Sequence, residues 1–241
     1  MTTDGQGRAN SQAPNRLDRR KARTRAALVA AAQRLLAEQG RADVSIQEIT
    51  EAADVGFGSF YNHFTSKDEL FDAAVALTLE EHGALLDSVV GDLKDPAEVF
   101  SASVRLTGGL QRTHPQMARI LVRTGMPYLT SESGLAPQAM RDLQAAADSG
   151  RLDIDDPHTA VAMVGGALLG VLHLLETRPD LDAERVTDQL TARLLCMFGM
   201  TRAEAQEIAT RPLPALPATW PGRFPAPAAR RGLHPLGGAA P

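Results

Sequence analysis

The fold of this chain is decided by the stretch SIQEITEAADVGFGSFYNHF, residues 45–64. The stretch opens with a capping box, in which Ser45 precedes a helix and Glu48 stands three residues later. A first short helix is therefore expected to begin at once, and residues 53–56 predict a tight turn. A second short helix is expected over residues 57–64. The stretch thus predicts two helices joined by a turn.

The second predicted helix has an apolar face and a more polar one. Phe60 and Phe64 lie four residues apart and can pack inward together. That spacing leaves the other side chains outward: Gly58, Ser59, Tyr61, Asn62 and His63. A helix-turn-helix uses such an outward face to read bases in the major groove of DNA. Helix corners in proteins that bind no DNA have similar spacing, so a helical adaptor that binds protein remains an alternative.

A basic segment surrounds this stretch and an acidic segment follows it. Residues 16–67 contain 9 Lys and Arg against 6 Asp and Glu, whereas residues 68–241 contain 15 against 22. Six of the bases lie in residues 16–25, at the start of a helix expected from Asp18 to a stop at Gly40. Cations at a helix N-terminus oppose the helix dipole, which favours a phosphate partner. A solvated helix start would carry the same charges.

The composition favours an all-helical protein in a reducing compartment. Aromatic residues make up 4% of the chain, and Ala and Leu dominate its apolar set, which favours helices over sheets. Cys196 is the single cysteine, so the chain can form no internal disulfide and a cytoplasmic location is expected. No uninterrupted run of about 18 apolar residues occurs, so we expect no membrane span.

Sequence motifs of enzymes are absent from the chain. It contains no nucleophile elbow, P-loop, dinucleotide-binding glycine motif or His/Cys metal spacing. Asp155 and Asp156 are adjacent acids, but an aspartate directly before Pro157 is typical of a helix cap. We therefore expect no enzyme activity, no cofactor and no metal site. His82 and His114 are interpreted as surface or capping residues.

Helix signals continue to about residue 210. The helix expected at 157–176 is apolar almost all round between residues 160 and 175. Such a helix must be buried on every side, and a second subunit is the simplest cover in a soluble chain. A homodimer is therefore expected. Eight prolines and four glycines in residues 211–241 predict a disordered tail, and the polar residues 1–15 predict a disordered leader.

The stretch and its continuation resemble a known family. Residues 55–70 read VGFGSFYNHFTSKDEL, and the run Tyr-x-His-Phe-x-Ser-Lys-x-x-Leu within them is similar to the signature of the tetracycline-repressor (TetR) family. The resemblance covers residues 19 to about 80; beyond them only the helical pattern and the length agree. It implies a dimeric, DNA-binding transcriptional regulator, most often a repressor that a small-molecule inducer releases.

The resemblance also implies a division of the chain. A three-helix helix-turn-helix DNA-binding domain is expected at residues 16–66, and a helical regulatory and dimerisation domain at residues 67–210. The operator sequence, the inducer, the regulated genes, the choice between repression and activation and the role of the Pro-rich tail are not specified by the sequence.

Individual DNA contacts follow from the same resemblance. Tyr61 and Lys67 would contact phosphates, whereas changes at Ser59 or Asn62 would alter sequence preference. Family members often carry polar residues where this chain has Gly56 and Phe57, and Phe57 is expected to make either a local packing contact or a contact with a thymine methyl group. The predicted DNA-binding residues are Arg23, Arg25, Ser45, Gln47, Phe57, Gly58, Ser59, Tyr61, Asn62, His63 and Lys67.

Two further sets of residues are predicted in the body by analogy with the family. A ligand pocket among the middle helices would be lined by Met117, Leu121, Met126, Tyr128, Met140, Met163 and His173. Each of these residues could instead be ordinary core. The dimer interface would be formed by Val164, Gly165, Leu168, Leu172, Leu190 and Leu194. The expected partners are operator DNA, an unknown small molecule and a second copy of the chain.

Overall fold

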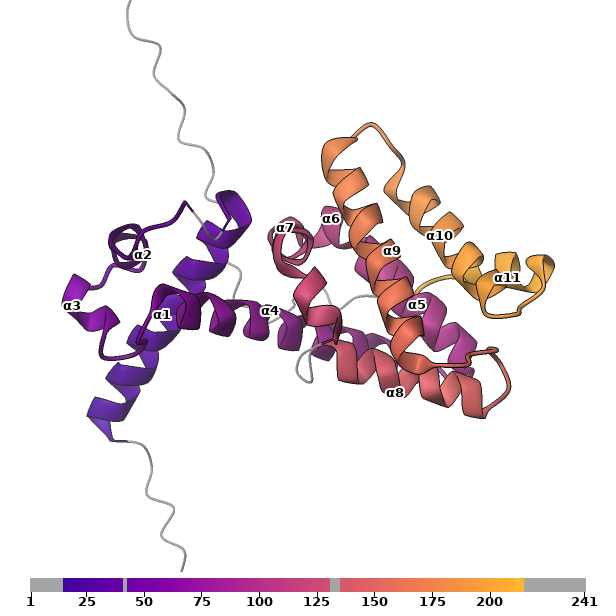
Figure 1. Ribbon diagram of the computed structural model, residues 1–241, viewed down its shortest axis with the longest axis horizontal. Coiled ribbons are helices and arrows are strands. Elements are labelled where there is room, and N and C mark those ends of the chain that lie inside the picture. The colour runs from indigo at the N-terminus through magenta and orange to yellow at the C-terminus, as the bar shows by residue number, and fades with distance from the viewer. Residues whose placement is uncertain (1–14, 41–42, 131–134, 215–241) are drawn as a thin grey trace, which may run out of the picture.

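The computed structural model describes residues 15–40, 43–130 and 135–214, so the predicted leader at 1–15 and tail at 211–241 lie almost wholly outside the description. Within the described residues every regular element is a helix, which confirms the predicted all-helical fold (Figure 1). The helices are α1 (Arg16–Glu38), α2 (Ile46–Ala52), α3 (Phe57–Phe60), α4 (Lys67–Val90), α5 (Pro96–Gly108), α6 (Leu110–Thr113), α7 (Pro115–Thr124), the 3-10 helix η1 (Met126–Thr130), α8 (Leu135–Asp148), α9 (Pro157–Thr177), α10 (Ala183–Met197) and α11 (Arg202–Ala209).

Helices α1, α2 and α3 form a head at one end of the molecule (Figure 1). Asn15 caps α1 in a capping box with Asp18, so the helix begins slightly before the expected residue. Ser45 accepts a hydrogen bond from the Glu48 N–H and forms the predicted capping box of α2. Gly40 has a φ of 84° directly after α1, a backbone conformation that glycine adopts readily, and it ends the helix as predicted.

Helix α3 is shorter than the sequence predicted. It ends at Phe60, and the chain continues in turns in which the Phe64 N–H donates to the Phe60 carbonyl at 3.0 Å. Gly58 and Ser59 are poor helix formers, which accounts for the short helix. Phe60 and Phe64 are nevertheless both buried, so the recognition element keeps its predicted inward face.

Helix α4 leaves the head and runs into the body (Figure 1). Ser66 caps it by accepting from the Glu69 N–H, and the Glu69 carboxylate accepts hydrogen bonds from Thr65. The helix packs against α1 in the head and against α5, α7 and α8 in the body. Its ends therefore belong to different halves of the molecule.

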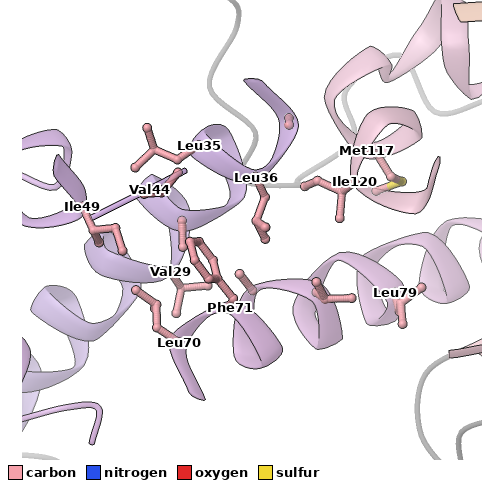
Figure 2. Packing of buried hydrophobic residues seen from close by; sticks show 14 of the residues in the cluster. Val29, Leu35, Leu36, Val44, Ile49, Leu70, Phe71, Leu79, Met117 and Ile120 are labelled. Carbon is pink, nitrogen blue, oxygen red and sulfur yellow. The ribbon is translucent and has the colours of Figure 1, made fainter. Parts of the chain in front are cut away.

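One apolar core joins the head to the body. It contains residues of α1, α2, α3 and α4 together with Met117, Ile120 and Leu121 of α7 and Leu172 of α9. Figure 2 shows Ile120 beside Leu36 of α1, with the α4 residues packed along the same core. Because a packed core resists deformation, the position of the head depends on the position of α7.

Helix α9 is the most apolar element and is covered on one side only. Met163 and Leu174 remain 47% and 40% exposed on its other side. By length and composition alone, the helix could cross a membrane. We did not expect this from the sequence, because we considered only an uninterrupted apolar run. Only 28% of its apolar window is buried within the protein. A single helix of this kind is weak evidence for a membrane span. An exposed apolar helix face is also typical of a contact with another protein chain.

Candidate nucleic-acid interface and ligand pocket

The residues predicted to bind DNA all lie on the head or at the start of α4. Figure 1 shows α2 and α3 at the outer edge of the head, away from the body. Three of the predicted residues, Ser59, His63 and Lys67, are half-buried. The remainder are exposed: Arg23, Arg25, Ser45, Gln47, Phe57, Gly58, Tyr61 and Asn62.

An aromatic cluster shapes the recognition element. Phe57 packs edge-on against Tyr61 with ring centroids 6.0 Å apart, and Tyr61 packs edge-on against the buried Phe60 at 5.2 Å. Phe57 is still 53% exposed. The local packing contact expected for Phe57 is therefore present, and its exposed edge also remains accessible to a thymine methyl group.

The basic start of α1 lies close to the turn that follows α3. The guanidinium carbon of Arg25 lies 5.0 Å from the centroid of the Phe64 ring, a cation–π arrangement. Burial lowers the pKa of His63, and the nearby positive charges of Lys21 and Arg25 lower it further. Two cations of α1 thus lie beside the recognition residues, as a surface that binds phosphates requires.

Lys67 has a structural contact that the sequence did not reveal. Its ammonium Nζ donates a hydrogen bond to the Val44 carbonyl at 2.8 Å and so ties the start of α4 to the residue before Ser45. Replacement of Lys67 would therefore loosen the head as well as remove a charge.

A cavity of about 150 Å³ lies in the body between α4, α5, α7, α8 and α9. Most of its wall is apolar, and Leu79, Leu121 and Leu172 are shared with the core that joins head and body. The described residues of its wall include neither Lys nor Arg, the side chains that would neutralise an anionic ligand. The polar lining residues are His82, Ser103, Thr107, Gln138 and Asp142.

His82 is a pocket residue that the sequence interpretation placed wrongly at the surface. It is fully buried, and its Nε2 lies 3.0 Å from the Thr107 Oγ1. Burial lowers the pKa of His82 to about 4, and the proximity of His114 opposes its protonation further. The signal was available, because His82 continues the apolar spacing of Val75, Leu79 and Leu86 on one side of α4. His114 stands at the N-cap of α7, but its side chain makes no capping hydrogen bond.

Asp142 of α8 contributes a carboxyl group to the wall of the cavity. Burial raises the pKa of Asp142, and the negative charge of Asp87 raises it further. Asp87 itself accepts a hydrogen bond from Gln138. This wall is therefore acidic in character and accepts hydrogen bonds when Asp142 is ionised.

The residues predicted to line a pocket are not brought together. Leu121 lies in the wall of the cavity. Met117 is buried in the core between head and body, and Met140 packs in the core of the body. Met126 is 63% exposed, and Met163 and His173 point away from the core on α9. The side chain of Tyr128 lies outside the described residues.

The residues predicted at the dimer interface divide in a similar way. Val164, Leu172 and Leu194 are buried within the chain, and Leu168 lines the cavity. A Cβ added at Gly165 would lie 2.3 Å from a Leu129 methyl group, so this glycine faces inward as well. Leu190 packs partly buried beside the same core. None of the exposed residues in the middle of α9 was predicted at the interface; these residues are Ala162, Met163, Gly170, His173 and Leu174.

Two family models match the chain. Residues 28–74 match the model described as "Bacterial regulatory proteins, tetR family", and residues 95–211 match "Tetracyclin repressor-like, C-terminal domain". The "Uncharacterized HTH-type transcriptional regulator Rv1255c" of Mycobacterium tuberculosis is 29% identical over 129 residues. That match covers 54% of this chain and 63% of the relative, so the chain spans less than two thirds of the length of this curated relative.

Solved structures give longer matches. RolR without ligand is 34% identical with a TM-score of 0.65, and the match covers 80% of this chain and 100% of RolR. RolR in complex with resorcinol is 33% identical with a TM-score of 0.61, and the match covers 83% and 99% of the two chains. The fatty acid degradation regulator FadR from Bacillus halodurans, 17% identical with a TM-score of 0.59 over 71% and 94% of the two chains, shares the fold.

Proposed function

This chain belongs to the TetR family of bacterial regulatory proteins, and we propose that it is a homodimeric transcriptional repressor that leaves its DNA operator when a small molecule fills the cavity. One observation carries the proposal. Leu79, Leu121 and Leu172 line the cavity and also belong to the core that holds the head. A ligand that shifts these side chains must change the packing beneath α1.

The DNA-binding half of the proposal rests on the head. Its exposed polar residues lie on α3 and the following turn, and Lys21 and Arg25 lie beside them. The head alone would supply phosphate contacts and a short set of base contacts. Two heads held at a fixed spacing are needed for a long operator, since two-fold dimers read half-sites about 34–36 Å apart.

The outer face of α9 is the proposed dimer interface. It is apolar and exposed, and Gly166 and Gly170 have open space where a side chain would begin. Glycines of this kind allow two helices to approach closely. A membrane is the less favourable cover, because the inner face of the same helix builds the wall of the cavity and packs against α7 and α8. We place the protein in the cytoplasm.

The first ligand to test is resorcinol, because RolR was solved in complex with it and is 33% identical to this chain. In an anisotropy titration, the full chain should bind a duplex from upstream of its own gene at least ~10³-fold more tightly than unrelated DNA. Resorcinol should then weaken operator binding by roughly 5- to 150-fold.

Two results would contradict the proposal. Equal affinity for operator and unrelated DNA would favour the helical adaptor, which requires no operator. Operator binding that no ligand of the cavity changes would remove the inducer from the mechanism. The family consists of transcriptional regulators, and no catalytic role is proposed for the chain. Among the described residues, no group of three His, Cys, Asp or Glu could hold a metal ion.

A further inference from the structure

The cavity wall contains a buried hydrogen-bond acceptor without a partner. His82 is fully buried and lines the cavity, and its Nδ1 makes no hydrogen bond within the described part of the chain. Such a group costs about 1–3 kcal/mol of stability when it stays unpaired. Buried polar atoms in native proteins rarely lack a partner, and Ser103 Oγ, from another residue of the cavity wall, is a second such atom. Both atoms therefore call for an explanation.

Thr107 decides which nitrogen of His82 carries the hydrogen. The Thr107 hydroxyl donates to the Ser103 carbonyl at 2.7 Å, which uses the only hydrogen of that hydroxyl. While the hydroxyl keeps that bond, the contact of 3.0 Å between His82 and Thr107 has His82 Nε2 as donor and Thr107 Oγ1 as acceptor. A neutral ring with its hydrogen on Nε2 leaves a bare lone pair on Nδ1.

The ring is neutral because its surroundings disfavour a positive charge. The side chain is fully removed from water, and His114 lies near it. An acceptor in such a place is satisfied by an uncharged hydroxyl or N–H donor. A carboxylate or phosphate ligand would meet a bare lone pair at His82 and the carboxyl group of Asp142 in the same cavity wall.

The size of the cavity limits the body of the ligand. Its volume of about 150 Å³ is comparable to that of an engineered apolar cavity that admits benzene. Leu79, Val104, Leu121 and Val161 are among the apolar residues that would surround a ring. The ligand therefore has an apolar body about as large as one ring and a donor at one edge.

We propose, resting on the proposed function, that His82 selects the effector: an uncharged, single-ring-sized compound whose hydroxyl donates a hydrogen bond to His82 Nδ1. Thr107 acts as a positioning residue, since it accepts from Nε2 and keeps Nδ1 unprotonated. The effector thus satisfies an atom that the folded chain leaves unpaired.

Three probes of similar size, toluene, anisole and phenol, test this selection through the order of their affinities. Toluene leaves water more readily than phenol does, so a purely apolar cavity binds toluene more tightly. Anisole keeps the oxygen of phenol but has no donor. Isothermal titration of the full chain should show phenol binding about tenfold more tightly than either, because it gains a hydrogen bond and satisfies Nδ1.

Substitutions test whether His82 causes the preference for phenol. His82→Phe should abolish the preference for phenol and retain toluene, whereas the exposed control His158→Phe should bind all three probes as the natural chain does. Circular dichroism establishes that each variant is folded. Nitrogen NMR of the natural chain gives a second measurement that needs no variant. It should find His82 Nδ1 unprotonated, with a shift that moves when phenol is added and stays in place with toluene.

The possible outcomes separate this inference from the proposed function. Phenol that binds no more tightly than toluene, absence of binding by all three probes, or a protonated Nδ1 would each overturn the role of His82. Operator release by other ligands would still stand in those cases. Conversely, selective phenol binding that leaves operator affinity unchanged would support His82 and contradict release.

Discussion

At the scale of single residues, the sequence predicted local capping and helix-stop residues correctly, but it did not predict where side chains lie in the tertiary fold. Ser45 and Gly40 act through neighbours a few residues away, so the sequence was sufficient to place the cap and the helix stop. His82 was misplaced because its spacing from Val75, Leu79 and Leu86, which puts it on the buried face of α4, was not used. Its role depends on Thr107, which is distant in sequence and meets it only in the fold.

Burial of His82 makes the stability of the chain dependent on pH. Its pKa is about 4 in the folded state against an ordinary value of 6.5, so the unfolded chain takes up a proton at a higher pH than the folded chain. Stability is therefore full above about pH 6.5 and declines as the pH falls toward 4. Urea unfolding at fixed protein concentration should show the natural chain losing about 2 kcal/mol more than His82→Phe between pH 7 and pH 5. Equal losses of stability in the two proteins would mean that His82 takes up a proton as readily in the folded chain as in the unfolded chain.

Substitutions in the head should distinguish residues that contact phosphates from residues that contact bases. Arg23 is exposed on α1, and Arg23→Ala should weaken binding to all DNA alike and reduce the salt slope by about 1. Asn62 is exposed in the recognition turn, and Asn62→Ala should cost about 1–3 kcal/mol on the operator and little on unrelated DNA. Anisotropy titrations at several salt concentrations measure both effects. Arg23 is a clearer choice than Lys67, whose ammonium also holds the Val44 carbonyl. An Asn62→Ala loss that is equal on all sequences would exclude Asn62 from base reading.

At the scale of elements, helix existence was more predictable than helix orientation. The capping residue Asp156 marked the start of a helix, and it caps α9 in the structure. Asp95 and Asp182 cap α5 and α10 in the same way. The apolar pattern of α9 predicted burial on every side, whereas the chain itself covers one side only. A helix apolar on every side does not show which side faces its own core. Val164 and Leu172 therefore appeared equivalent to Met163 and Leu174, although only the latter pair is exposed.

The outer face of α9 can be tested with one glycine. No atom of the described residues lies within 4 Å of a Cβ added at Gly166, so the side chain of Gly166→Leu begins in open space. Leucine also favours a helix by roughly 1 kcal/mol over glycine, which protects the fold. The variant should weaken the dimer at least ~10-fold by steric conflict with the partner, whereas Gly166→Ala should change it far less. Sedimentation equilibrium over a range of concentrations measures both. A Gly166→Leu protein that dimerises normally would place the interface elsewhere.

At the scale of the whole molecule, the head and body act as one packed unit. The core runs from Leu28 and Ile49 in the head to Ile120 and Leu172 in the body without interruption. Gln33 of α1 also donates a buried hydrogen bond to Thr78 of α4 at 3.1 Å. The sequence predicted two domains with a boundary near residue 66, and it could not predict this continuity, because α1 and α7 are far apart in the chain. Neither the shared core nor the cavity has a local sequence signature.

Continuity of the core predicts how ligand and DNA affect one another. If a ligand lowers operator affinity by some factor, the operator must lower ligand affinity by the same factor, because coupling between two binding sites is reciprocal. Ile120 lies in the contact between α7 and the head but not in the wall of the cavity. Ile120→Val removes one methyl group at a cost of about 0.5–1.5 kcal/mol in stability.

The variant should therefore reduce both coupling factors equally while the affinity of each ligand alone stays nearly constant. Anisotropy and calorimetry on the same preparations, with resorcinol and the operator, give the four constants that are needed. Coupling that Ile120→Val leaves intact would mean that the signal travels along α4 alone. A ligand that changes operator affinity without the matching reverse effect would show that the two measurements report different states of the protein, since a single equilibrium forbids that result.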